Sequence, residues 1–224
     1  MNPALMPNMP FRGVDDFAPI GLLAYVTNTL VVHPSVPANN VKELIAYAKA
    51  HPSKLAYASA GAGSTNHLSA VLLERLAGIE MLHVPYKGGA PAVTDVVAGQ
   101  TQLLFTAGTQ SLPPVKAGAL KLLAVTEANR SSLLPDVTTV AETVLGYELA
   151  VWYGAFAPAG TLKEIVARLN AEINKVLNMP EVKTRMSAIG VEVATTTPEQ
   201  FAALLKKEEQ RYGKLIHDFG IRAE

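Results

Sequence analysis

The chain of 224 residues is 49% hydrophobic and 17% charged, a composition that excludes a disordered chain and is typical of a globular protein. Its 19 basic residues balance 19 acidic ones, so no overall positive field attracts nucleic acid or an anionic membrane surface. The absence of cysteine excludes disulfides, thiolate catalysis and cysteine-bound zinc.

The N-terminal part of the chain is expected to hold an irregular lead-in, a pair of strands and a helix. Residues 1–16 are rich in Pro and contain no apolar segment of the kind found in signal peptides. The longest apolar stretch, 20–32, is interrupted by polar residues and is too short to span a bilayer. The strands are expected at 17–26 and 29–33, or as one bent strand, and the helix at 41–51 with Asn39 or Asn40 as its N-cap.

The segment 55–89 has the pattern strand, Gly/Ser-rich turn, helix, strand and second Gly-rich turn. Small residues alternate along its start, as in a strand that is buried on both faces. Gly61 and Gly63 permit backbone conformations that other residues rarely adopt, and Ser64 or Thr65 is expected to cap the helix that follows. Such a turn presents free backbone N–H groups and hydroxyls at the positive end of a helix. The segment is therefore predicted to bind an anionic oxygen, of a carboxylate or a phosphate.

The rest of the chain continues this alternation and then becomes mainly helical. Strands separated by helices predict parallel α/β units through the middle of the chain. The chain is expected to leave one lobe near 25–30 and to return near 150–154, which makes 30–149 one contiguous lobe. The further elements are expected as helices at 66–76, 90–98, 111–117, 137–144, from the N-cap Thr161 to 177, at 181–189 and from Thr197 and Pro198 towards Phe219, and as strands at 102–106, 120–126, 147–158 and 191–194.

Several characteristic stretches stand in one order along the chain: DFAPIGLLA, LVVHPS, YASAGAGSTNHLSA, MLHVPYKGGAPAVTDVVAGQ, KLLAVT, LPDVTTVAE and WYGAFAPAG. Together they closely resemble the Bug family, the substrate-binding receptors of tripartite tricarboxylate transporters. The resemblance implies an α/β fold of the periplasmic-binding-protein type II kind, whose two lobes close on a small carboxylated solute. It also implies a periplasmic receptor, neither an enzyme nor a cofactor protein, that passes its solute to the membrane subunits of the transporter.

The same resemblance implies that 30–149 is the second lobe and that 1–29 and 150–224 are the remnant of the first. Family members begin with a signal peptide and a further segment that carries the Pro/Gly-rich turn of the first lobe. Neither is present here, so the first lobe is expected to be incomplete, or the chain to be part of a longer protein begun at an internal methionine. The exposed strand edges of an incomplete lobe predict a homodimer that covers them, or poor solution behaviour.

A second departure concerns the solute. Many family members carry an Asp in the turn after the strand that corresponds to 103–106, where it meets a solute amino group. This chain has Thr106, Ala107, Gly108 and Thr109 there. An amino-acid solute is therefore less expected, while dicarboxylates, tricarboxylates and aromatic carboxylates all remain open.

The expected solute contacts lie mainly on the two Gly-rich turns. Tyr86 has a ring to pack and a hydroxyl to donate, whereas Lys87 is equally well explained as a solvated surface residue. His67 is expected to pack or to support the turn, and Trp152 is either a core residue or a wall of the cleft. The residues predicted to bind ligand are Ser59, Ala60, Gly61, Gly63, Ser64, Thr65, His67, Tyr86, Lys87, Gly88, Gly89, Thr106 and Trp152.

Two other functions are weighed against the receptor. A serine-dependent hydrolase would use Ser59 or Ser64, but it needs a base within hydrogen-bond reach, and the G-x-S-x-G elbow is absent. The effector-binding domain of a transcriptional regulator would share the fold and would need a helix-turn-helix segment before residue 1. A phosphate-loop spacing is absent around Lys87. The remaining histidines lack the spacing of a metal site and are interpreted as structural or surface residues: His33, His51, His83 and His217.

Overall fold

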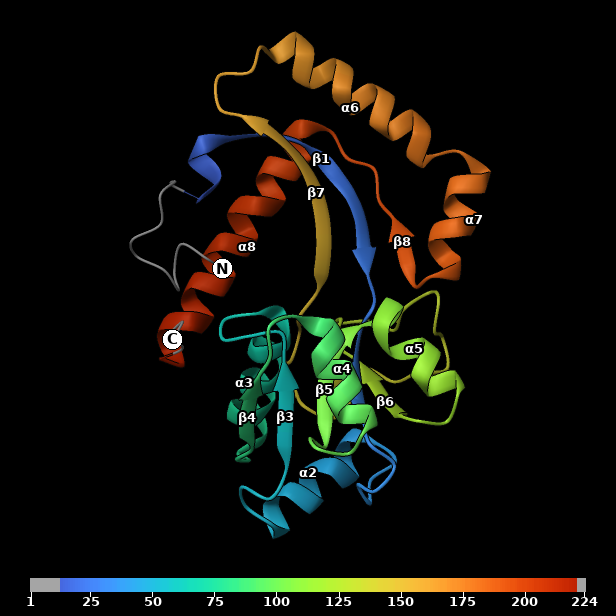
Figure 1. Cartoon of the computed structure of the whole chain (residues 1–224). Helices are drawn as coiled ribbons and strands as arrows, with labels where there is room; N and C mark the ends of the chain where they lie inside the picture. The colour runs from blue at the N-terminus through green and yellow to red at the C-terminus, as the bar shows by residue number, and fades with distance from the viewer. Residues whose placement is uncertain (1–12, 221–224) are drawn as a thin grey trace. The chain divides into compact units, whose positions relative to one another are not determined.

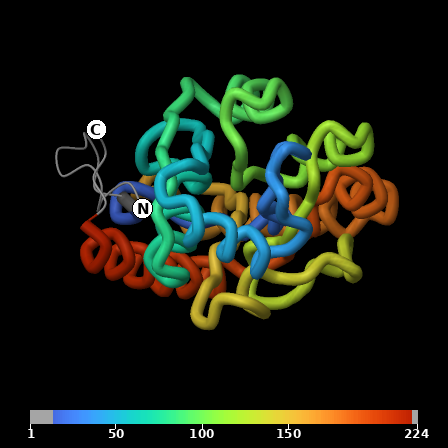
Figure 2. The backbone as a smooth tube through the Cα atoms, turned by 90° about the horizontal axis from the view of Figure 1, so that it is seen from below, coloured from blue at the N-terminus to red at the C-terminus, as the bar shows by residue number. Residues whose placement is uncertain are grey.

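The structure, a computed structural model, describes residues 13–220 of the chain (Figures 1 and 2). Two compact units are present: unit 1 comprises Met1–Tyr25 and Trp152–Glu224, and unit 2 comprises Val26–Val151. Unit 2 is the run from blue through green to yellow in Figure 2. The expected second lobe, 30–149, falls within unit 2. Of the expected lead-in 1–16, only the 3-10 helix η1, Gly13–Asp16, lies among the described residues.

Unit 2 is built on a mixed sheet of five strands in the order β4-β3-β5-β2-β6. Its strands are β2 (Asn28–Val32), β3 (Ala56–Ser59), β4 (Leu82–Pro85), β5 (Leu103–Ala107) and β6 (Lys121–Val125). β3 pairs in parallel with β4 and with β5, as predicted, but β2 is antiparallel to β5 and to β6. The expectation of parallel units was wrong for β2. This strand follows β1 directly and enters the sheet beside the carboxyl end of β5, where Asn28 pairs with Ala107. It therefore runs opposite to its neighbours, although a helix then connects it to β3.

Helices cover both faces of this sheet: α2 (Val41–Ala50), α3 (Thr65–Ala77), α4 (Gly89–Val97) and α5 (Gly108–Lys116). Successive strand residues point to opposite faces. Ala58 and Leu104 therefore pack with Val96 of α4 in one buried cluster. Tyr57, next to Ala58, faces the other way, and its ring lies 6.3 Å from that of His67 on α3. The short buried strands thus separate two apolar layers.

Local capping sets where the helices of unit 2 begin. Asn40 is the N-cap of α2, since its side chain accepts a hydrogen bond of 2.9 Å from the N–H of Glu43, and Ser64 is the N-cap of α3. α5 begins at Gly108, earlier than predicted, and the N–H of Gly108 donates to the carbonyl of Thr27, between β1 and β2, at 2.7 Å. The short helix expected at 137–144 is a single 3-10 turn, η2, at Val140–Glu142.

Unit 1 contains a three-stranded sheet in the order β7-β1-β8, with β1 at Phe17–Val26, β7 at Val151–Pro158 and β8 at Val191–Val193. Its helices are α6 (Lys163–Leu177), α7 (Pro180–Ala188) and α8 (Pro198–Asp218). Thr197 caps α8 as predicted, in a capping box with Gln200. The prediction that Thr161 caps α6 was wrong: its hydroxyl donates to the carbonyl of Pro158 at 2.7 Å, and the cap position is Leu162.

Several apolar side chains of α6 and of its N-cap residue, Leu162, are exposed in unit 1. Leu162 is 63% exposed, Ile165 48% and Val176 47%. The homodimer expected from the sequence stays a prediction. This face of α6 offers apolar surface that a second copy of the chain would cover. Among residues 13–220, no helix combines the length and the apolar character that crossing a membrane requires.

Candidate functional site

Three helices of unit 2 start at one edge of its sheet. β3, β4 and β5 are neighbouring parallel strands, so their carboxyl ends lie at the same edge. α3, α4 and α5 follow these strands in turn, and their N-termini start from that edge. In open α/β sheets this is where ligands bind, because helix N-termini and short turns collect there.

The turn between β3 and α3 is held by its own hydrogen bonds. The N–H of Gly61 donates to Ser59 Oγ at 3.1 Å, and the N–H of Gly63 donates to His67 Nδ1 at 2.9 Å. The N–H of Ser64 donates to the carbonyl of Gly61 at 3.2 Å. Gly61 and Gly63 have φ angles of 122° and 73°, a region that favours glycine. Three of the expected donors are therefore occupied within the turn.

Other backbone amides of the same turn are not occupied. Within the part of the chain that the structure describes, no protein atom accepts a hydrogen bond from the N–H of Ala60, Ala62, Thr65 or Asn66. Thr65 and Asn66 are the first two residues of α3, where intrahelical acceptors do not exist. The helix dipole adds positive potential at this end. Free donors thus remain on a turn that other contacts hold in place.

A stack of aromatic and imidazole rings supports the turn. The rings of His67 and His83 lie 4.2 Å apart and are tilted by 2°, and Tyr57 stacks on His83 at 4.9 Å. Ser59, which is fully buried, lies with its Oγ 2.7 Å from His83 Nε2. Burial lowers the pKa of His83, so its neutral form is favoured. His83, interpreted from the sequence as a structural residue, comes to this contact because β3 and β4 pair in parallel over 56–59 and 82–85, with His83 opposite Tyr57.

The second Gly-rich turn is joined to the first. The N–H of Tyr86 donates to the carbonyl of Ser59 at 2.9 Å, and a Cβ on Gly61 would lie 3.5 Å from the carbonyl oxygen of Tyr86. The Tyr86 hydroxyl, expected to donate to a solute, donates to the carboxylate of Asp95 instead. Burial and that carboxylate raise the pKa of Tyr86 to about 12. Lys87 is exposed, as the surface interpretation predicts.

Thr106 is linked to the helix starts at this edge of the sheet by Gln110, which is not among the predicted ligand-binding residues. Its Oγ1 donates to Gln110 Oε1 at 2.8 Å. Gln110 also lies against Gly89, where an added Cβ would come within 2.6 Å of Gln110 Oε1. Gln110 therefore links the start of α4 to the start of α5. An isolated glutamine in a helix carries no sequence signal for such a role.

Trp152 belongs to unit 1, whereas the other predicted ligand-binding residues belong to unit 2. Its ring meets Phe201 edge to face, with centroids 5.6 Å apart. It packs against a cluster formed by Leu22, Phe201 and Leu205. This packing agrees with the interpretation of Trp152 as a core residue.

The serine contacts bear on the hydrolase interpretation. Ser59 has a base within reach in His83, but the complete burial of Ser59 keeps its oxygen from an external substrate. Ser64 Oγ accepts from the backbone N–H of His67 at 3.3 Å, which is a helix cap and not a contact with the imidazole. Among the described residues, no group of three or more His, Asp or Glu side chains is placed to hold a metal ion.

The architecture of the chain is that of periplasmic binding proteins, with α/β units and mixed sheets. The structure titled "R. palustris Rpa4515 with adipate" superposes with a TM-score of 0.91 at 35% identity, covering 97% of this chain and 73% of that one. The periplasmic binding protein BugD superposes with a TM-score of 0.89 at 33% identity, covering 99% and 75%. MatC (Rpa3494) from Rhodopseudomonas palustris with bound malate gives a TM-score of 0.84 at 30% identity, covering 96% and 74%.

Residues 1–221 match the family described as "Tripartite tricarboxylate transporter family receptor", and the chain belongs to this family. The resemblance found in the sequence is thus confirmed. A relative from Pseudomonas sp. (strain P51), the "UPF0065 protein in tcbD-tcbE intergenic region", is 38% identical over 219 residues. That match covers 97% of this chain, which spans 65% of the relative's length.

Proposed function

We propose that this chain is a solute-binding receptor that holds a carboxylate of a small metabolite at the start of α3. The observation that carries the proposal is the set of N–H groups of Ala60, Ala62, Thr65 and Asn66, which have no acceptor among the described residues. They belong to a turn that is already rigid, so binding costs little ordering. Family membership supports a dicarboxylate, as do two similar structures, one with adipate and one with bound malate.

The expected affinity follows from the number of donors. A hydrogen bond to a charged group contributes about 1.5–3 kcal/mol net. Two or three such bonds, with the dipole of α3, support a free energy of binding near −8 kcal/mol, which corresponds to a dissociation constant of about 1 μM.

The wider role is also a proposal. Unit 2 would act as the second lobe and unit 1 as part of the first, and a ligand that contacts both would favour a closed state. The receptor would work in the periplasm and deliver its solute to the membrane subunits of a tripartite tricarboxylate transporter. Family membership supports both statements.

Two substitutions of Thr65 distinguish the contribution of its backbone N–H to solute binding from that of its side chain. Thr65 is the first residue of α3, a position that accepts proline, and Thr65→Pro removes its N–H while keeping the helix. Thr65→Ala is the matched control, since it removes the hydroxyl and keeps the N–H. Isothermal titration with adipate and malate should show Thr65→Pro weakened about tenfold relative to Thr65→Ala, because roughly 1.4 kcal/mol of hydrogen bonding is lost.

A thermal-shift screen over adipate, malate, citrate and benzoate identifies the solute before that titration, because a ligand that binds the folded state raises the melting temperature. Equal affinities of the two Thr65 variants would contradict a carboxylate contact at the start of α3. The hydrolase alternative predicts turnover of ester substrates that is lost in Ser59→Ala. The receptor proposal predicts no turnover by the wild-type protein.

A further inference from the structure

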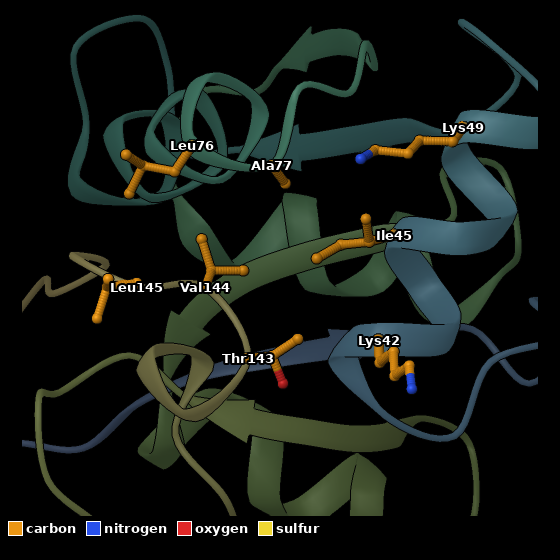
Figure 3. Close-up of a pocket in the computed structure, with 8 residues that line it drawn as sticks. All are labelled: Lys42, Ile45, Lys49, Leu76, Ala77, Thr143, Val144 and Leu145. Atoms are coloured by element: carbon orange, nitrogen blue, oxygen red, sulfur yellow. The ribbon is translucent and has the colours of Figure 1, made fainter.

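A groove in unit 2 lies at the far end of α3 from the proposed solute site. It encloses about 350 Å³ between α2, the end of α3 and the loop after η2 (Figure 3). Its lining consists of Lys42, Ile45, Lys49, Leu76, Ala77, Thr143, Val144 and Leu145. At 1.5 Å of rise per residue, Leu76 lies roughly 16 Å along the helix from Thr65. The groove is therefore separate from the proposed site.

The rim of the groove presents leucines to solvent. Leu145 is 94% exposed, and Leu76 is 40% exposed. Ile45 points from α2 towards Val144, across the groove from these leucines (Figure 3). Exposed apolar side chains that flank a groove are typical of docking surfaces, because a partner that covers them removes apolar area from water.

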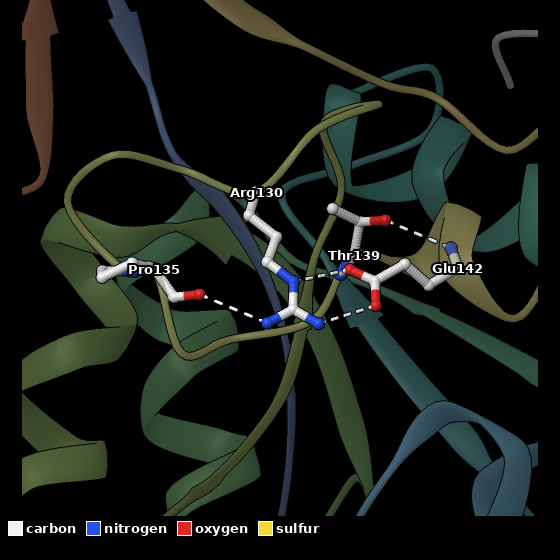
Figure 4. A network of polar contacts seen from close by, with 4 residues as sticks. All are labelled: Arg130, Pro135, Thr139 and Glu142. Carbon is white, nitrogen blue, oxygen red and sulfur yellow. Dashed lines mark hydrogen bonds and ion pairs between the residues drawn. The ribbon is translucent and has the colours of Figure 1, made fainter.

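The loop that carries Leu145 is held firmly. Arg130 binds Glu142 through two hydrogen bonds of 2.8 Å, and Glu142 Oε1 also accepts the N–H of Thr139 at 3.1 Å (Figure 4). Val144, next to Leu145, is only 6% exposed and anchors the loop in the core. An exposed leucine on a loop that is already ordered loses little entropy on contact with a partner.

The charge of the groove is positive and uncompensated. Lys42 and Lys49 lie seven positions apart on one face of α2, about 10 Å along the helix axis, with Ile45 between them. Within residues 13–220, neither lysine forms an ion pair. Two acids next to lining residues are already engaged: Glu142, beside Thr143, by Arg130, and Glu43, beside Lys42, within the cap of α2.

We propose that this groove docks an acidic segment of a partner protein. The segment would present an apolar side chain to Ile45, Leu76 and Leu145, and carboxylates on both sides of it to Lys42 and Lys49. Two lysines whose backbone positions are about 10 Å apart along α2, with Ile45 between them, match a peptide that alternates acidic and apolar groups over a similar length. A small solute would leave Leu145 uncovered, because solute sites enclose most of their ligand.

The test is a selection of random displayed peptides against the whole chain, followed by fluorescence anisotropy with the enriched peptide. We expect enrichment of sequences with Asp or Glu on both sides of a Leu, Phe or Trp. The double variant Lys42→Glu with Lys49→Glu should bind the enriched peptide at least about tenfold more weakly, and Leu145→Ser about fivefold. The matched control, Lys116→Glu with Lys175→Glu, makes the same charge change elsewhere and should bind like wild type.

Circular dichroism confirms that each variant is folded, which is expected because all the substituted side chains are exposed. No enrichment of acidic sequences, or equal loss of binding in the control variant, would overturn the proposal. Binding of decanoate in the groove, without binding of an acidic peptide, would also overturn the proposal. Adipate titration of the double variant should match wild type, so that failure of the docking proposal and failure of the solute proposal are distinguishable.

Discussion

Replacing Ser59 with alanine removes the side chain that ties the turn after β3 to the sheet. Ser59 is fully buried, and its Oγ accepts from the N–H of Gly61 at 3.1 Å and lies 2.7 Å from His83 Nε2. In Ser59→Ala, the N–H of Gly61 and Nε2 of His83 both lose this oxygen as a hydrogen-bond partner. A buried polar group that loses its partner costs about 1–3 kcal/mol.

The magnitude follows from the burial of those partners. Gly61 and His83 are only partly buried, so water replaces some of the lost bonding and the lower end of the range applies. Two such groups at about 1–1.5 kcal/mol each give an expected loss of about 2–3 kcal/mol in the free energy of unfolding. Ser64→Ala is the comparison, since it removes only a helix cap and should cost about 1 kcal/mol.

Urea unfolding followed by far-UV circular dichroism measures both variants. Tryptophan fluorescence does not serve here, because the single tryptophan, Trp152, is in unit 1. A cost for Ser59→Ala that is equal to or below that of Ser64→Ala would refute the view that Ser59 organises the turn. The solute affinity of Ser59→Ala should fall as well, since the free amides would no longer be held in one arrangement.

Four further predictions concern pH dependence and packing. Burial lowers the pKa of His83, so the unfolded state takes up its proton more readily, and stability should rise with pH up to about 6.5. The His83→Gln variant should lose that part of the slope in urea unfolding measured across pH. A Cβ on Gly154 would lie 2.0 Å from Phe201 Cζ, so Gly154→Ala should cost at least about 1–3 kcal/mol. Gly213→Ala on α8, whose Cβ meets nothing within 4 Å, should instead gain up to about 1 kcal/mol, and tryptophan fluorescence reports both. The guanidinium of Arg130 lowers the pKa of Glu142 to about 2. The Glu142 carboxylate therefore stabilises its loop above about pH 4.3, and this stabilisation is lost as the pH falls towards 2. Hydrogen exchange of that loop should lose this acid dependence in Glu142→Gln.

Much of the local structure was predictable from the sequence. The strand, turn and helix around Ser59 and Ser64, and the caps at Asn40 and Thr197, depend on residues within four positions of each other. Such short-range contacts leave a direct sequence pattern. The order of several such motifs also identified the family, which the comparisons confirm.

The arrangement of the proposed site depends on contacts that no local pattern contains. Ser59 meets His83 because β3 and β4 pair in one particular register, and β2 runs antiparallel because it enters the sheet beside the carboxyl end of β5. The Tyr86 hydroxyl turns to Asp95, and Gln110 links two helix starts. That a Gly/Ser turn with donor groups precedes α3 could be predicted from the residues alone, because glycine conformation and capping are local. The tertiary structure sets which groups support that turn, because the contact of Ser59 with His83 and the approach of Tyr86 to Gly61 depend on how β3 and β4 pair.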